Sequence, residues 1–211
     1  MSSDEMAALR AEPVTNCPHG LADAAGCPDC QAPAITFDPV TLMRIPEEFR
    51  GATLERVPAT VRDAIAPFLA GSAAFLWLGG NVGAGKSYTA CAVLNHTFLH
   101  RGIAGRFWAV TEIADCYRAA SSPDYEGPWP AAALDNALML APLLVLDDLG
   151  KEWKTDFSVA KLYRVVDARH SERRPTIVTT NLDPGAIDLP IRSRLLSGIE
   201  VRFTGQDRRR Q

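Results

Sequence analysis

Residues 73–90 read AAFLWLGGNVGAGKSYTA and carry three structural signals in one stretch. The unbroken apolar run at 73–78 predicts a strand that is buried on both faces. The glycines that follow predict a tight turn, and the alanine-rich run from Lys86 onward predicts a helix. Strand, turn and helix in this order make the first half of a β-α-β unit, so the stretch predicts an α/β fold with a parallel sheet.

The rest of the chain repeats this rhythm of short apolar runs and longer amphipathic stretches. We therefore expect a three-layer sandwich around a central parallel sheet, with helices on both faces. The last run alternates, as an edge strand does, and a proline- and glycine-rich stretch predicts a loop at 121–130. Further strands are predicted at 106–110, 143–146, 176–179 and 199–203, and helices near 60–70, 86–101, 112–119, 131–140, 155–171 and 190–197.

The turn from Gly80 to Ser87 matches the pattern G-x-x-x-x-G-K-[ST] of phosphate-binding loops. In such a loop the backbone N–H groups face a phosphate, and the helix N-terminus adds partial positive charge. We expect Lys86 to reach the β- and γ-phosphates and the Ser87 hydroxyl to bind Mg²⁺. The alternative is a glycine-rich turn that contains Lys-Ser by chance. The predicted nucleotide-binding residues are Gly80, Asn81, Val82, Gly83, Ala84, Gly85, Lys86, Ser87 and Tyr88.

Two carboxylates, Asp147 and Asp148, directly follow the apolar run at 143–146. Ionised groups at the end of a buried strand are costly unless a cation lies nearby, and a bound Mg²⁺ would supply that cation. We expect Asp147 to hold the metal and Asp148 to orient or deprotonate the attacking water. The alternative is a structural Asp-Asp-Leu-Gly turn.

A third predicted strand, 176–179, ends in the polar pair Thr180-Asn181. The Asn181 amide has both donors and an acceptor, so it can contact a γ-phosphate or the attacking water. The alternative is an asparagine turn or a helix cap.

Taken together, these motifs resemble the AAA+ ATPases of the DnaC type, which load replicative helicases, and of the IstB type, which assist transposition. The resemblance covers most of residues 43–211 and includes TTNL and LLVLDDLG besides the phosphate loop. It also includes IPEEFR at 45–50, IRSRLLSG at 191–198 and FTGQDRR at 203–209. It implies ATP and Mg²⁺ as cofactors, a nucleotide pocket between subunits, and Arg194 as the arginine finger presented to a neighbouring subunit's ATP.

The resemblance further implies that residues 45–50 lie against the adenine and that segments after the second strand contact single-stranded DNA. Candidate DNA contacts are Lys151, Lys154 and the loop around Trp129. Two departures from the family pattern bear on activity. Asp148 stands where many AAA+ enzymes have the longer glutamate, which predicts slow hydrolysis, and the residues after Asp207 leave no space for a helical lid domain.

Three functions are compatible with these motifs. The first is an ATP-dependent helicase loader in DNA replication, which uses ATP as an assembly switch with single-stranded DNA and a replicative helicase. The second is a transposition helper whose partner is a transposase on duplex DNA. The third is an adaptor that holds ATP without turnover.

Residues 1–42 are predicted to form a separate segment before the ATPase domain at 43–211. Cys17, His19, Cys27 and Cys30 are four ligands of the kind that bind tetrahedral zinc, which predicts a zinc-organised module. The alternative is a tail with free thiols. By resemblance this segment would be the adaptor that grips the helicase. The remaining cysteines, Cys91 and Cys116, fall in predicted helices and are expected to pack in the core.

Composition narrows the class of protein. The 211 residues include 22 Lys and Arg against 25 Asp and Glu, a net charge of −3, with 47% hydrophobic and 22% charged residues. These values exclude collagen, coiled coil and wholesale disorder, and they exclude a protein that coats nucleic acid through bulk positive charge. The charges are unevenly distributed along the chain: residues 1–50 contain eight acidic and three basic residues, and the C-terminal end is rich in arginine. An acidic start and the lack of a long apolar run predict a cytoplasmic protein.

Overall fold

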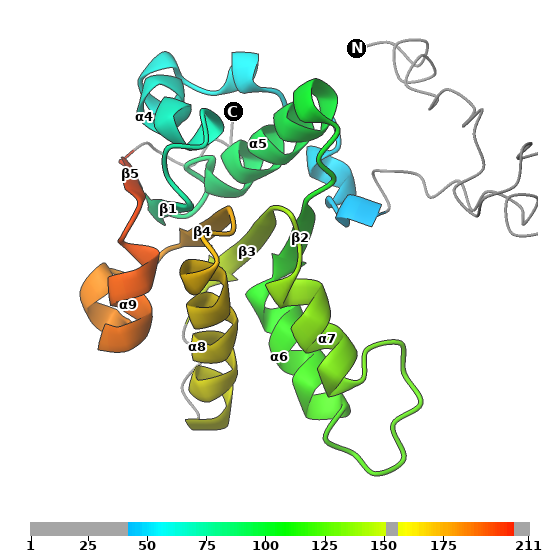
Figure 1. The fold of residues 1–211 in the computed structure, drawn as a ribbon. Helices are drawn as coiled ribbons and strands as arrows, with labels where there is room; N and C mark the ends of the chain where they lie inside the picture. Colours follow the sequence, from blue (N-terminus) through cyan, green and yellow to red (C-terminus); the bar gives the residue numbers. More distant parts are fainter. Residues whose placement is uncertain (1–41, 151–155, 205–211) are drawn as a thin grey trace, which may run out of the picture. The chain divides into compact units, whose positions relative to one another are not determined.

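The computed structural model describes residues 42–150 and 156–204, with side chains from residue 159 onward in the second range. All of these residues lie in one unit of the chain, Pro39–Gln211 (Figure 1). The four residues of the predicted zinc site and the candidate DNA contacts Lys151 and Lys154 lie outside the described residues.

In the described part of the chain, five strands form one sheet in the order β2-β3-β4-β1-β5. Every neighbouring pair is parallel, which confirms the predicted parallel α/β sheet. The last strand lies at an edge, as its alternating sequence predicted. The strands are β1 (Phe75–Gly80), β2 (Arg106–Ala109), β3 (Leu144–Leu149), β4 (Thr176–Thr180) and β5 (Ile199–Phe203).

Helices cover both faces of this sheet, which gives the expected three layers (Figure 1). One face carries α4 (Ala59–Leu69) and α5 (Lys86–Arg101). The other carries α6 (Val110–Ala119), α7 (Ala131–Met139), α8 (Asp156–Ser171) and α9 (Leu189–Leu195). The chain between α6 and α7 forms the loop predicted from its prolines and glycines. Short 3₁₀ turns are η2 (Glu47–Phe49), η3 (Leu54–Arg56) and η4 (Pro184–Ala186).

Two separate hydrophobic cores follow from the period of the strands. Successive strand residues point to opposite faces, so Leu76 and Leu78 pack toward α4 and α5, while Phe75 and Trp77 pack toward the other helix layer. Both sets are buried, which explains why the strand reads as an unbroken apolar run. Cys91 lies in the first core and Cys116 packs against the second, as predicted.

A buried guanidinium ties the second helix layer to the sheet. Arg169 of α8 is 0% exposed and donates to the carbonyl oxygens of Leu138, Met139, Ala141 and Pro175 and to the Thr176 hydroxyl. Burial lowers the pKa of this arginine to about 9, because desolvation disfavours its charged form. The carbonyls at the end of α7 carry partial negative charge and compensate the cation.

The described helices also bear on the sequence observation that the chain has no long apolar run. Within 42–150 and 156–204, no helix combines the length and apolar character that a membrane crossing requires.

Candidate functional site

A cavity of about 460 Å³ opens where β1, β3 and β4 reach their carboxyl ends. In open parallel sheets this edge is the usual place for a ligand. The phosphate-binding loop forms one wall and the polar ends of β3 and β4 form another. Lining residues from these walls are Val82, Gly83, Ala84, Gly85, Lys86, Ser87, Tyr88, Asp147, Asp148, Thr179 and Asn181.

The loop takes its shape from glycines that adopt backbone angles unfavourable for other residues. Gly80 has φ 133°, and a Cβ atom there would come within 2.1 Å of the Phe203 carbonyl oxygen. Gly85 has φ 100° and immediately precedes α5, whose first residue is Lys86. The N-terminus of α5 therefore faces the cavity, where its N–H groups favour an anion.

Lys86 is held inside the loop, with only 7% of its surface exposed. Its Nζ donates to the carbonyl oxygens of Gly80 at 3.0 Å and Asn81 at 2.6 Å, and to Asn181 Oδ1 at 2.7 Å. The ammonium thus lies between the loop and the end of β4. These acceptors fix the position of a cation at the edge of the cavity.

Asp147 lies next to two hydroxyl groups. Thr179 Oγ1 donates to Asp147 Oδ1 at 2.7 Å, and the Ser87 hydroxyl bonds to the same carboxyl group. Burial raises the pKa of Asp147 above its ordinary value, and the two hydroxyls and the Lys86 ammonium offset only part of that rise. A partly buried carboxylate beside a serine hydroxyl is a hard oxygen donor set that fits Mg²⁺.

This environment predicts that Asp147→Asn stabilises the metal-free fold. Because the folded pKa lies above the unfolded one, the ionised group opposes folding at neutral pH and stops doing so as the pH falls through the folded value. We expect the variant to melt about 2–4 °C higher near pH 7, roughly the effect of 1 kcal/mol in a chain of this size. Melting curves recorded from about pH 7 to about pH 4.5 should show the difference in melting temperature between variant and wild type becoming smaller.

Asp63→Asn, which alters an exposed aspartate of α4 that does not line this cavity, is the matched control. The prediction would be contradicted if the difference in melting temperature between Asp147→Asn and wild type stayed constant with pH. An equal rise of the melting temperature in the control would contradict it too.

Asn181 connects the lysine to the second carboxylate. Its Oδ1 accepts from Lys86 while its Nδ2 donates to Asp148 Oδ1 at 2.9 Å. These two partners fix which way the amide points. The structure therefore brings together Lys86, Asp148 and Asn181, as the motifs predicted.

Aromatic and apolar side chains also line the cavity. Phe49 and Tyr88 meet edge to face with ring centroids 6.5 Å apart, and the Tyr88 hydroxyl accepts from the Thr53 backbone N–H at 3.2 Å. Within the segment 45–50 that was expected to face the base, Phe49 lines the cavity and Ile45 is part of the hydrophobic core. Sequence reasoning did not assign Arg56, Val57, Pro58, Thr89, Thr179 and Phe203 to the cavity, which they also line.

Two of the predicted loop residues, Gly80 and Asn81, do not line the main cavity. Gly80 and Asn81 line a neighbouring cavity of about 210 Å³ together with Asn181 and Arg202. Val82 lines the main cavity, but 58% of its surface is exposed. The part of the loop that encloses the main cavity therefore begins at Val82.

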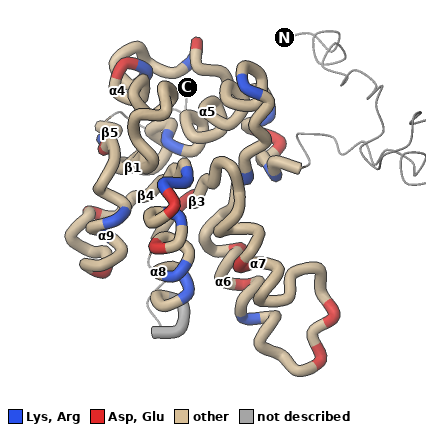
Figure 2. Tube along the Cα trace, viewed as in Figure 1, with Lys and Arg blue, Asp and Glu red and all other residues tan. Residues whose placement is uncertain are grey.

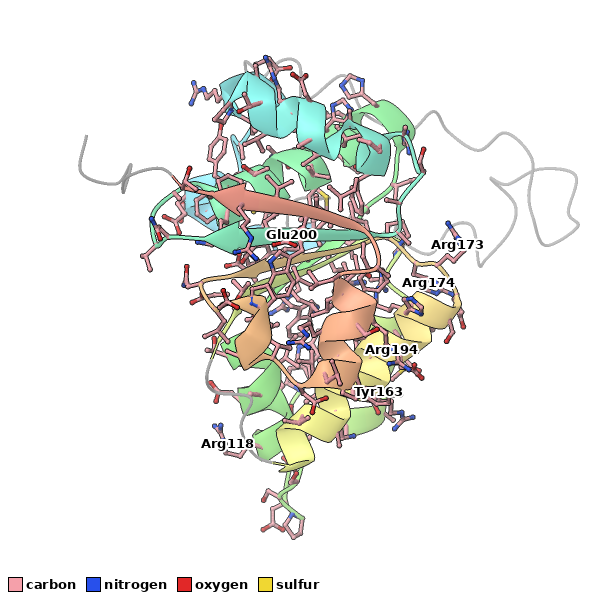
Figure 3. All side chains as sticks on the ribbon, turned by 90° about the vertical axis from the view of Figure 1, so that its left-hand side faces the viewer. Arg118, Tyr163, Arg173, Arg174, Arg194 and Glu200 are labelled. Carbon is pink, nitrogen blue, oxygen red and sulfur yellow. The ribbon has the colours of Figure 1, made fainter. Side chains whose placement is uncertain are left out.

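Arg194 does not line the cavity that the described residues of its own chain enclose. Its Nε donates to Asp167 Oδ1 at 2.6 Å, its second nitrogen to the Tyr163 hydroxyl at 2.9 Å, and its third to the Pro190 carbonyl. Tyr163 and Arg194 lie side by side on α8 and α9 (Figure 3). The guanidinium is half-buried against α8.

The candidate DNA loop around Trp129 has a different character from the one expected. Trp129 packs edge-on against the buried Trp108 at 5.1 Å, so its ring already contributes to the core. The loop between α6 and α7 carries acidic residues, Asp124 and Glu126, whereas basic residues recur along α8 (Figure 2). Acidic side chains disfavour contact with phosphates.

Comparison with known proteins gives matches in sequence and in fold. Over 111 residues the chain is 28% identical to the replicative helicase loader DnaC of Escherichia coli K12, a match that covers 53% of this chain and 44% of that protein. The chain thus aligns with less than half the length of this curated relative. No protein-family model matches the chain.

Two solved structures share the fold. A crystal structure of the DnaC helicase loader superposes with a TM-score of 0.60 at 18% identity, over 76% of this chain and 100% of that one. A replication initiator DnaA bound to AMPPCP and single-stranded DNA superposes with a TM-score of 0.63 at 16% identity, over 77% of this chain and 51% of that one. The fold is therefore the P-loop AAA+ fold that the motifs predicted.

Proposed function

Since the chain resembles the DnaC-type AAA+ ATPases in motifs, sequence and fold, we propose that it is an ATP-binding helicase loader that acts in DNA replication. ATP serves as an assembly switch, and hydrolysis is slow. The partners in this proposal are a replicative helicase, single-stranded DNA and further copies of the chain.

The proposal that the chain binds a nucleotide rests on the residues that line one cavity. Its lining includes the rings of Phe49 and Tyr88 together with the N-terminus of α5, Lys86 and two carboxylates. Aromatic rings suit a base, and a helix N-terminus with a lysine suits phosphates. A nucleoside triphosphate matches this set of chemical groups.

Each polar residue has a distinct role in the proposed reaction. Lys86 would exchange its loop carbonyls for phosphate oxygens. Ser87 and Asp147 would hold Mg²⁺, which neutralises charge on the phosphates when it is bound. Asp148 would accept the proton of the attacking water, and the Asn181 amide would orient both the carboxylate and the water. The carboxylate of Asp148 is one methylene shorter than that of a glutamate, which supports slow turnover.

The proposed binding partners are inferred from the proteins that this chain resembles. The matched Escherichia coli protein is a replicative helicase loader, and the DnaA structure holds single-stranded DNA. The position of Arg194 outside its own cavity supports a role at a neighbouring subunit.

Co-purification of the full chain with its cellular partners, with and without ATP, tests the proposal. Mass spectrometry should identify a hexameric replicative helicase whose recovery depends on ATP, and ATP titration should show saturable binding. Recovery of a transposase would instead support the transposition helper. Binding of ATP without any release of phosphate would support the adaptor, and absence of ATP binding would overturn the nucleotide assignment.

A further inference from the structure

The two carboxylates of the site lie on an irregularity in the sheet. Strand β3 pairs with β4 through Leu146 and Val178, and next through Leu149 and Thr180. Because β3 advances three residues where β4 advances two, β3 contains a bulge at Asp147-Asp148. Bulges beside functional sites commonly re-aim side chains.

The bulge places Asp148 in an unusual backbone conformation. Its φ angle is 55°, in the left-handed region that residues with side chains rarely adopt, although aspartate and asparagine tolerate it best. Such conformations persist only where surrounding contacts hold them. The contact here is a hydrogen bond from the Asp148 backbone N–H to Thr179 Oγ1 at 2.8 Å.

The same hydroxyl also bonds to the carboxylate of Asp147. Thr179 Oγ1 accepts from Asp148 and donates its one proton to Asp147 Oδ1 at 2.7 Å. Thr179 is 1% exposed, so water cannot easily replace either bond. A single oxygen atom therefore bonds to both the backbone turn at Asp148 and the Asp147 carboxylate, which the Ser87 hydroxyl also contacts.

We propose that Thr179 is a positioning residue of this site: its hydroxyl points the Asp147 carboxylate at the Mg²⁺ position beside Ser87 and holds the backbone turn that directs Asp148 to Asn181. The inference rests on the proposed ATP site and adds a residue that the phosphate-loop and carboxylate motifs do not contain. Outer contacts of this kind matter because a metal-binding carboxylate must already be oriented when the ion arrives.

The adjacent residue provides a matched control. Thr180 lies on the same strand and is equally buried, and its hydroxyl donates to the Leu149 carbonyl and accepts from the Leu182 backbone N–H. It contacts neither carboxylate. Thr180→Val removes a buried hydroxyl from β4 just as Thr179→Val does, so the pair separates positioning from general loss of strand stability.

The experiment measures ATP binding by the full chain in excess EDTA and during titration with MgCl₂, with melting temperature as a fold check. We expect Thr179→Val to raise, by roughly 10-fold to 100-fold, the Mg²⁺ concentration at which the Mg²⁺-dependent increase in ATP binding is half-maximal. A change of this size is typical when a residue that orients a metal ligand is lost. ATP affinity in EDTA should stay within roughly twofold of wild type, since the ammonium of Lys86 and the loop are unchanged. Thr179→Ser should restore the wild-type Mg²⁺ dependence.

Several outcomes would overturn the inference: a wild-type Mg²⁺ dependence in Thr179→Val, an equal shift in Thr180→Val, or a Thr179→Ser variant that behaves like Thr179→Val. If Thr179→Val does not fold, Thr179→Ala and Thr179→Ser differ by the hydroxyl alone, and only the alanine variant should show the shift. A wild-type chain that binds no ATP would overturn the proposed function itself. Mg²⁺-dependent binding that is insensitive to Thr179 would overturn the positioning role alone.

Discussion

Lys86→Ala is expected to weaken ATP binding at least about 100-fold. The wild-type ammonium lies at the phosphate end of the cavity, where the folded loop already holds it through Gly80, Asn81 and Asn181. It therefore needs little reordering when a phosphate arrives. Each charge-assisted hydrogen bond contributes about 1.5–3 kcal/mol, and about 1.4 kcal/mol corresponds to a tenfold change in affinity. Loss of two such bonds gives the stated effect.

Isothermal titration of the full chain with Mg²⁺ and ATP measures this affinity. Lys161→Ala is the control, because Lys161 is a partly buried lysine that pairs with Asp135 away from the cavity. Its ATP affinity should equal that of wild type. Unchanged affinity in Lys86→Ala, with the melting temperature near wild type, would contradict the assignment of this cavity to nucleotide phosphates.

The elements that the sequence predicted well are those governed by local periodicity. The helix expected at 86–101 and the strand expected at 199–203 match α5 and β5 to the residue, because a phosphate loop sets the start of the first and alternation marks the second. The expectation that 45–50 faces the base stays a prediction, and Phe49 is the residue of this segment that lines the cavity. A segment of this kind has no period, so its burial depends on the surface against which it packs.

The features that the sequence did not predict depend on partners distant along the chain. The Thr179 hydroxyl accepts from the Asp148 backbone N–H, 31 residues away, and donates to the Asp147 carboxylate, 32 residues away. The bulge that brings these groups there exists only in the pairing of β3 with β4. Arg169 likewise reads as an ordinary helix arginine, because the carbonyls that surround it lie at the end of α7, just after α7 and directly before β4. The TTNL motif contains Thr179, but nothing in the sequence alone shows which groups its hydroxyl contacts.

Arg194→Ala is expected to reduce ATP turnover by about 10³ or more while it leaves ATP affinity near wild type, because an arginine finger neutralises charge only as it develops on the transferred phosphate. Arg194 lies outside its own chain's cavity and is held by Asp167 and Tyr163. Its charge is paired with Asp167 within its own chain, so the guanidinium would exchange that partner for a neighbouring copy's phosphate. Arg192→Ala, in the same helix, is the matched control and should retain turnover.

Mixing two inactive variants separates a contribution to the neighbour from a structural role. Lys86→Ala lacks the phosphate-binding lysine but keeps Arg194, and Arg194→Ala has the opposite defect. If the arginine acts on a neighbour's ATP, a mixed assembly contains sites with an intact cavity from one chain and an intact arginine from the other, so phosphate release should reappear on mixing. A structural role for the Arg194–Asp167 pair would leave every such chain defective. Mixed samples that remain as inactive as either variant alone would therefore rule out the finger and return Arg194 to a packing role between α8 and α9.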